Sequence, residues 1–267
     1  MRTRLTDTRQ FMRAFVDRAS HFSLPMAQWL CAVLLSWVGL PGVSHAGSFH
    51  VTPVKVTLSS QTTTYVLKVE NNGTTNVTLQ LKTLEWTQQD GRDQLQPTRE
   101  VLVTPPLFNL KSGATQIVRL ALMRKPDADR ELSYRLLLEE VPSPPAADFK
   151  GVQIALRIGI PIFVTPVLKA KQDLGFTTFQ SPDGQWHLNV ANRGLAHSQI
   201  TGVTLYATGT QDSPMASYSN ATYVLPGQAR SLVLTREQPL SATGARLAVR
   251  AQTRSGLVES YADLITP

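Results

Sequence analysis

The chain has 267 residues and a single cysteine, Cys31, which lies in an apolar stretch near the amino terminus. Everything after residue 46 is therefore free of cysteine. Small secreted scaffolds are held together by several disulfides, so this class is excluded, and a hydrophobic core has to stabilise the fold alone. The same lack excludes thiolate catalysis and cysteine-ligated metal sites.

Histidine and the short motifs of catalysis are also scarce. After residue 46 the chain has only His50, His187 and His197, and it contains no G-x-S-x-G, H-E-x-x-H, phosphate-loop or calcium-loop pattern. We therefore predict a protein that is not an enzyme and that needs no metal or other cofactor. A hydrolytic triad assembled from distant residues stays open as an alternative.

Basic charge is not concentrated in any one part of the sequence. The formal net charge is +7, but residues 1–46 hold five arginines and two aspartates, which leaves 21 basic and 17 acidic residues, or +4. A nucleic-acid-binding surface would show clustered basic residues with interleaved aromatic ones. We expect no nucleic-acid partner.

The first 46 residues have the composition of an export signal. Five arginines precede an apolar run over residues 26–40, and the small-residue site Ser44-His45-Ala46 follows it. This order predicts a secretory signal peptide over residues 1–46 that is cleaved after about Ala46. The run is short for the alternative, a membrane-spanning helix.

Short runs of alternating apolar residues fill the rest of the chain. They include residues 54–58, 65–69, 77–81, 117–122 and 134–141. Turn chemistry separates them at Asn71-Asn72-Gly73, at Asp90-Gly91 and at Thr104-Pro105-Pro106. No long helical period appears, so the pattern predicts an all-β sandwich fold.

The second half of the sequence repeats features of the first. Residues 69–73 (V-E-N-N-G) recur as residues 190–194 (V-A-N-R-G), and residues 110–113 (L-K-S-G) have a counterpart in residues 225–227 (L-P-G). The simplest account is two related sandwiches, over residues 47–166 and 167–267.

The longest alternating run lies just before this boundary. From Val152 to Val164 every even position is a large aliphatic residue, which predicts one strand about 40 Å long at about 3.3 Å per residue. Pro161 cannot donate a ladder hydrogen bond and therefore indicates an edge strand. An apolar edge invites aggregation unless another chain's strand completes it. The alternative is that the even positions form the inner face of a sandwich.

Several segments together resemble the periplasmic chaperones of the bacterial chaperone-usher pathway, which assemble pili or fimbriae. These segments are 104–106 (T-P-P), 110–120, 130–142 and 152–166. Residues 160–163 (I-P-I-F) are more similar to the archaic branch of the family. The resemblance implies two immunoglobulin-like domains in an L-shaped arrangement, of which the first binds subunits. It also implies a periplasmic protein whose partners are pilus subunits and an outer-membrane usher.

In this family, alternating aliphatic residues of the last strand of the first domain complete the unfinished sandwich of a pilus subunit. The matching donor-strand residues here are Val152, Ile154 and Leu156, extended by Ile158 and Ile160. The resemblance thus implies donor-strand complementation without a cofactor. From the residues alone, a structural or adhesive surface protein made of two immunoglobulin-like modules is the alternative.

The family also holds the carboxylate at the end of the subunit with two cations. Lys55 matches the first cation, whereas Pro161 stands at the position of the second. Arg157 is a possible substitute, and Arg119 and Arg135 are further candidates.

An ion-pair network connects the two domains in this family. Glu131 matches its acidic residue, but Thr165 replaces the usual basic residue. We therefore expect Glu131 to be interdomain, with a different stabilising partner.

Overall fold

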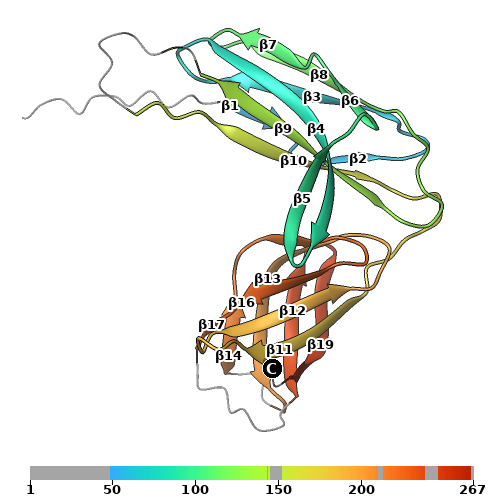
Figure 1. The fold of residues 1–267 in the computed structure, drawn as a ribbon, viewed down its shortest axis with the longest axis vertical. Coiled ribbons are helices and arrows are strands. Elements are labelled where there is room, and N and C mark those ends of the chain that lie inside the picture. Colours follow the sequence, from blue (N-terminus) through green and yellow to red (C-terminus); the bar gives the residue numbers. More distant parts are fainter. Residues whose placement is uncertain (1–48, 143, 145–151, 210–212, 238–245, 266–267) are drawn as a thin grey trace, which may run out of the picture. The chain divides into compact units, whose positions relative to one another are not determined.

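The computed structural model describes residues 49–142, 144, 152–209, 213–237 and 246–265. All regular structure in these residues is β-strand, which confirms the all-β prediction (Figure 1). The strands are β1 (Phe49–Thr52), β2 (Val56–Leu58), β3 (Thr64–Asn71), β4 (Val77–Gln89), β5 (Arg92–Pro97), β6 (Val101–Thr104), β7 (Leu107–Leu110), β8 (Thr115–Leu122), β9 (Leu132–Val141), β10 (Arg157–Val164), β11 (Leu174–Gln180), β12 (Trp186–Asn192), β13 (Ser198–Ala207), β14 (Pro214–Tyr218), β15 (Thr222–Val224), β16 (Ala229–Val233), β17 (Thr235–Arg236), β18 (Leu247–Thr253) and β19 (Gly256–Leu264).

Strands β1 to β10 form the first module, which has two sheets. The first sheet has the order β1-β3-β8-β6, and the second has the order β2-β10-β9-β4-β5 with β7 also paired to β4. Alternate residues of both sheets meet in one apolar core, as Leu67 and Leu120 do from the first sheet and Leu79 and Leu138 from the second. The period of two read from the sequence therefore defines this core.

Strands β11 to β19 form the second module. Its strands follow one continuous path, β16-β12-β11-β19-β18-β13-β14-β17, with β15 paired to β13. Leu188, Ile200, Leu205 and Val249 are among the residues of a separate apolar core. Each module thus has a core of its own.

The repeated V-x-N-x-G motif folds in the same way in both modules. Asn71 and Asn192 are each 1% exposed. Each side-chain amide donates to two backbone carbonyl groups, and each side-chain oxygen accepts from the backbone N–H of Gly73 or Gly194, two residues later. Since a buried amide must satisfy these groups, the asparagine fixes the turn, and the internal repeat is structural.

Asp90 and Gly91 form the two-residue turn between β4 and β5 that the sequence predicts. Both have positive φ, 50° for Asp90 and 72° for Gly91. Two residues of positive φ suit the right-handed twist of a hairpin, and aspartate followed by glycine is a favoured pair for them.

Strand β10 is shorter than predicted, since it begins at Arg157 rather than at Val152. Its antiparallel register pairs Arg157 with Glu139, and β9 ends two residues later, before Pro142. Pro142 cannot donate to a ladder, so residues 152–154 lie beyond the end of β9 and have no strand to pair with in the described part of the chain. The prediction of one continuous strand is therefore wrong for residues 152–156.

The other side of β10 is largely open, as Pro161 predicts for an edge strand. Strand β2 pairs with it in parallel over Ile162–Val164 alone. Among the described residues, no strand pairs with this side of Arg157–Pro161.

Candidate functional site

Strand β10 presents its two faces to different environments. Its even residues pack into or against the core of the first module: Ile158, Ile160, Ile162 and Val164. Its odd residues lie on the outer face of the second sheet: Arg157, Gly159, Pro161 and Phe163. Within the strand itself, the even positions therefore form the inner face of a sandwich, which was the alternative reading of the sequence.

Residues 152–156 precede this strand and carry exposed apolar side chains. Val152 is 87% exposed and Ile154 is 69% exposed, whereas Leu156 is half-buried. Leu156 is tied to the end of β9, because its carbonyl accepts from the N–H of Glu140 (2.9 Å) and its own N–H donates to the Glu140 carboxylate (3.2 Å). Large aliphatic side chains beside an open strand edge form a surface that another chain can cover.

The residues predicted as a donor strand thus differ in accessibility. Val152 and Ile154 are exposed, and Leu156 and Ile158 are half-buried. Ile160 is 1% exposed and belongs to the core. A side chain that fills the close-packed core of its own module is not available to fill a groove in another protein, so Ile160 leaves the set of candidate contacts.

Lys55 lies immediately before β2 and is half-buried. Its ammonium makes no hydrogen bond or ion pair with any described residue. Strand β2 pairs Val56 with Ile162 in parallel, and Lys55 lies in the bend that precedes this pairing. The predicted first cation is therefore one residue before the segment that pairs with β10.

Two of the three arginines considered as substitutes are poorly placed. Arg157 lies four residues before Pro161 on the same strand, and its Nε lies 2.9 Å from Oε1 of Glu139. Arg119 is exposed on β8, in the first sheet, and both its neighbours in sequence are buried in the core. The core therefore separates Arg119 from Pro161.

Arg135 lies on β9, directly opposite Pro161. Its guanidinium carbon is 3.9 Å from the centre of the Trp86 ring, and its Nη2 is 3.5 Å from Oδ2 of Asp93. Burial lowers the pKa of Arg135, and the nearby carboxylate opposes this effect. The guanidinium stays charged, as arginine does in proteins.

Glu131 is 6% exposed and contacts a residue of the second module. Its Oε1 accepts from the backbone N–H of His197 (3.0 Å) and lies 2.6 Å from Nδ1 of the same residue. The imidazole also stacks on the ring of Phe163, with 3.5 Å between ring centres. Thr165 stands where the resemblance implies a basic residue, and its hydroxyl donates a hydrogen bond to the carbonyl oxygen of Leu58.

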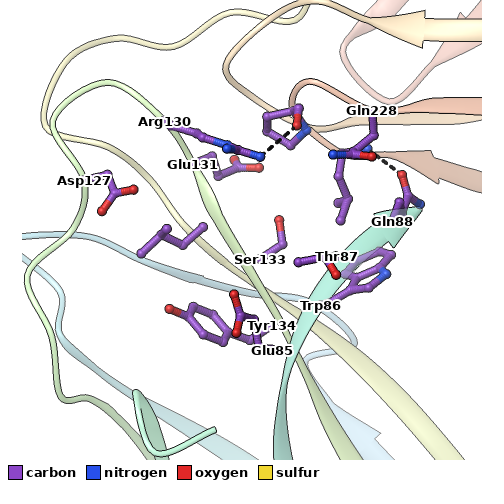
Figure 2. A pocket seen from close by; sticks show the side chains of 13 residues that line it. Glu85, Trp86, Thr87, Gln88, Asp127, Arg130, Glu131, Ser133, Tyr134 and Gln228 are labelled. Carbon is purple, nitrogen blue, oxygen red and sulfur yellow. Dashed lines mark hydrogen bonds between the residues drawn. The ribbon is translucent and has the colours of Figure 1, made fainter. Parts of the chain in front are cut away.

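A cavity of about 200 Å³ adjoins this contact (Figure 2). Polar side chains line most of it, and the buried hydroxyl of Ser133 has no hydrogen-bond partner among the described residues. Tyr134 donates to Oε2 of Glu100 (2.5 Å), and burial together with this carboxylate raises the pKa of Tyr134 well above its usual value. The cavity is smaller than the pockets of about 300–1,000 Å³ that hold small ligands, so it does not indicate a substrate site.

A further polar cluster was not found from the sequence. Gln88 is 4% exposed, and its side-chain amide donates to Oδ1 of Asp93 (2.9 Å) and to the carbonyl of Tyr223 (2.9 Å). Its side-chain oxygen accepts from the N–H of Leu225 (3.0 Å), and Nη1 of Arg230 lies 3.0 Å from Asp93. A glutamine in an alternating strand looks like a solvent-facing residue, so no signal in the sequence marks it as buried.

The carboxylate of Asp93 is stabilised in its charged form. Burial alone raises its pKa, but the amide of Gln88 and the guanidinium groups of Arg230 and Arg135 outweigh this effect and lower the pKa below 3.8. The group is therefore an anion at neutral pH.

The described residues include no group of three or more histidine, cysteine or carboxylate side chains placed to bind a metal ion. They also include no helix with the length and apolar character needed to cross a membrane.

Residues 48–168 match the family described as pili and flagellar-assembly chaperone, PapD N-terminal domain. No curated protein sequence matches the chain. Among solved structures, the archaic CsuC–CsuE chaperone-tip subunit complex of Acinetobacter baumannii matches with a TM-score of 0.60 and 18% identity, over 82% of this chain and 99% of that one.

Two further solved structures match in fold. The YadV chaperone has a TM-score of 0.55 and 19% identity, over 81% of this chain and 99% of that one. The complex of the SafA pilin with the SafB chaperone of Salmonella enterica has a TM-score of 0.53 and 18% identity, over 82% of this chain and 96% of that one. These likenesses confirm the predicted two-domain, immunoglobulin-like all-β fold.

Proposed function

As the chain belongs to the pili and flagellar-assembly chaperones through residues 48–168, we propose that it stabilises pilus subunits by lending them residues 152–156 as a strand. The observation that carries the proposal is the exposure of Val152 and Ile154 next to an open strand edge. Solved complexes with the same fold include a chaperone with a tip subunit and a chaperone with a pilin.

Strand addition explains why these aliphatic residues are tolerated in water. In an extended segment Val152, Ile154 and Leu156 point to the same side, so they can enter one groove together. Burying each such side chain stabilises a complex by about 1.5–3 kcal/mol. Backbone pairing and apolar burial thus supply the driving force, and the proposed activity needs neither a nucleotide nor a metal.

Lys55 is the proposed anchor for the carboxylate at the end of the subunit. Its ammonium has no partner within the described residues, and Lys55 immediately precedes the segment of β2 that pairs with β10. An ammonium can make charge-assisted hydrogen bonds to a carboxylate, which would fix the register of the added strand.

The proposal includes the location and the organisation of the protein. Residues 1–46 direct export and are removed, residues 47–166 form the subunit-binding domain, and residues 167–267 form the second domain. The mature protein acts in the periplasm and passes subunits to an outer-membrane usher. Glu131 and His197 contribute to the connection between the domains.

The test replaces Ile154 and Leu156 with aspartate. Each carboxylate would enter an apolar groove unpaired, so we expect binding to co-expressed pilus subunits to fall by at least about 100-fold. The readout is the amount of subunit that accumulates and copurifies. Val66→Asp is the matched control, because Val66 is 51% exposed on the first sheet, away from this edge.

Normal accumulation of subunits with the double variant would refute the donor-strand assignment. A folded variant that no longer protects subunits would support it. Membership of a chaperone family does not favour the alternative of an adhesive or structural surface protein.

A further inference from the structure

The last rung of the ladder between β9 and β10 is built partly from a side chain. The backbone N–H of Glu140 donates to the carbonyl of Leu156 (2.9 Å), as in a regular hydrogen-bonded pair. In such a pair the second residue returns a bond to the backbone carbonyl of the first. Here the N–H of Leu156 donates to Oε2 of the Glu140 side chain (3.2 Å). The carboxylate therefore takes the place of a backbone acceptor.

Pro142 prevents the next rung of this ladder. Hydrogen-bonded pairs alternate along an antiparallel ladder, so a ladder continued in the same register would next bond Ile154 to the residue at position 142. That residue is a proline, which has no N–H to donate to the carbonyl of Ile154. The carboxylate of Glu140 thus holds Leu156, the residue at which the proposed donor segment leaves the sheet.

We infer that Glu140 is a positioning residue for strand addition, because its carboxylate fixes Leu156 and so sets the direction in which residues 152–155 leave β10. This inference rests on the proposed function, since these residues belong to the segment that is lent to a subunit. Glu140 itself does not contact the subunit in this assignment, and it acts through Leu156.

The contact leaves the other edge of β10 available to a partner strand. Neighbouring residues of a strand direct their backbone N–H and C=O groups to opposite edges. The carbonyl of Leu156 faces β9, whereas the N–H of Thr165, directly after β10, donates to Leu58 at the end of β2 (2.9 Å). Odd-numbered residues such as Arg157 and Gly159 therefore direct their backbone groups to the open edge. A strand added there does not displace the bond between Leu156 and Glu140.

The carboxylate of Glu140 is not engaged by a cation. No basic side chain among the described residues forms an ion pair with it, whereas the preceding residue, Glu139, lies 3.0 Å from Nζ of Lys82 and 2.9 Å from Nε of Arg157. Neighbouring side chains of a strand point to opposite faces, so the two glutamates have different surroundings. Hydrogen bonds from a backbone N–H to a carboxylate are stronger than those between neutral groups. Glu140 is therefore suited to hold a backbone N–H.

Fixing Leu156 before binding makes strand addition more favourable. A residue that is mobile in the free protein loses conformational entropy when the complex forms, whereas a residue that is already fixed does not. Leu156 is the residue of the proposed donor segment nearest to β10. In an extended segment Ile154 and Val152 point to the same side as Leu156, so its position determines where they enter a groove.

The first measurement is hydrogen exchange at the backbone amide of Leu156, followed by NMR in the free protein. Glu140→Met removes the acceptor and keeps a chain of similar length, so exchange should become at least about tenfold faster, as expected for the loss of a hydrogen bond to a charged group. Glu140→Gln keeps an oxygen acceptor and should stay within about threefold of wild type. Glu139→Met is the matched control, because it removes the neighbouring carboxylate, and it should change exchange by less than about twofold.

The second measurement is binding of the Glu140 variants to a co-expressed pilus subunit. Glu140→Met should weaken binding by about tenfold, the cost of ordering about one more residue, and Glu140→Gln should bind within about threefold of wild type. A residue that only supports the fold would also lower the midpoint of thermal unfolding. Because Glu140 lies near the end of its strand, we expect this midpoint to stay within about 2 °C of wild type in both variants.

Faster exchange and weaker binding in Glu140→Met, with recovery of both in Glu140→Gln, would support the inference. Binding of Glu140→Met that equals wild type would overturn it and leave the proposed function intact, and so would unchanged exchange at Leu156. A loss of binding matched by a clear fall in the unfolding midpoint would overturn it as well. A wild-type protein that recovers no subunit would refute the proposed function, and the inference with it.

Discussion

Two isoleucines of the same apolar run show how the surroundings decide the role of a residue. Ile154 and Ile160 occupy equivalent positions in the alternation, six residues apart. Ile160 lies where β9 and the opposite sheet cover it and is 1% exposed, whereas Ile154 lies beyond the end of β9 and is 69% exposed. The first therefore stabilises its own module, and the second is accessible to the proposed partner.

We predict that alanine substitutions separate these roles. Ile160→Ala removes core contacts and leaves a cavity, so the free energy of unfolding should fall by about 2–5 kcal/mol. Ile154→Ala should change it by less than about 0.5 kcal/mol, because the side chain is in water. Urea unfolding of the isolated protein measures both values, and equal losses would contradict the assignment of Ile160 to the core and Ile154 to the free surface.

At the scale of elements, the sequence predicted the buried faces of strands and the turns between them better than the residues at which strands begin and end. Alternation placed Ile160 and Ile162 on one face, and the Asp90-Gly91 pair predicted its hairpin, because both depend on local geometry. The start of β10 could not be predicted, since it depends on where β9 stops in the folded sheet.

The candidate site was predictable only in part. Alternation marked the aliphatic segment, and the resemblance assigned roles to that segment and to Lys55. The pairing of Arg135 with Pro161 could not be predicted, because β9 and β10 are brought together only by folding. Gln88 is a buried polar residue, and its partners Tyr223 and Leu225 lie more than a hundred residues away in the chain, so composition and period gave no sign of its burial.

The β4–β5 hairpin should make stability depend on acid pH through Asp93. Its pKa is lowered in the folded protein, so the carboxylate contributes stability above its unfolded pKa and loses that contribution as pH falls through the folded pKa, below about pH 4. Asp93→Asn should therefore cost about 1 kcal/mol at neutral pH and progressively less at acid pH. Urea unfolding from about pH 6 to about pH 3 measures the difference.

Asp90→Asn is the control for this comparison, because it changes a carboxylate of the same hairpin at its turn. A difference between wild type and Asp93→Asn that stays constant over the whole pH range would rule out the carboxylate of Asp93 as its source.

At the scale of the whole molecule, the chain separates its only thiol from its folded modules. Cys31 lies in the proposed export signal, and both cores form from residues after position 46. Once the proposed signal is removed, the apolar cores have to supply the stability of the protein without a disulfide. A reductant should therefore leave its unfolding midpoint unchanged.

This separation makes the thiol a reporter of export. If the signal is removed after about Ala46, protein from the periplasm should begin near Gly47 and take up no iodoacetamide after denaturation, because the cysteine leaves with the signal.

Ala46→Arg replaces the small residue that cleavage requires. That variant should stay with the membrane and take up one label at its single cysteine. Mass spectrometry measures both the first residue and the label, and Ala46→Arg combined with Cys31→Ser controls for labelling elsewhere. Labelled wild-type protein in the periplasm would contradict cleavage between Cys31 and the first module, whereas an unlabelled protein beginning near Gly47 would support a mature chaperone that depends on its two apolar cores.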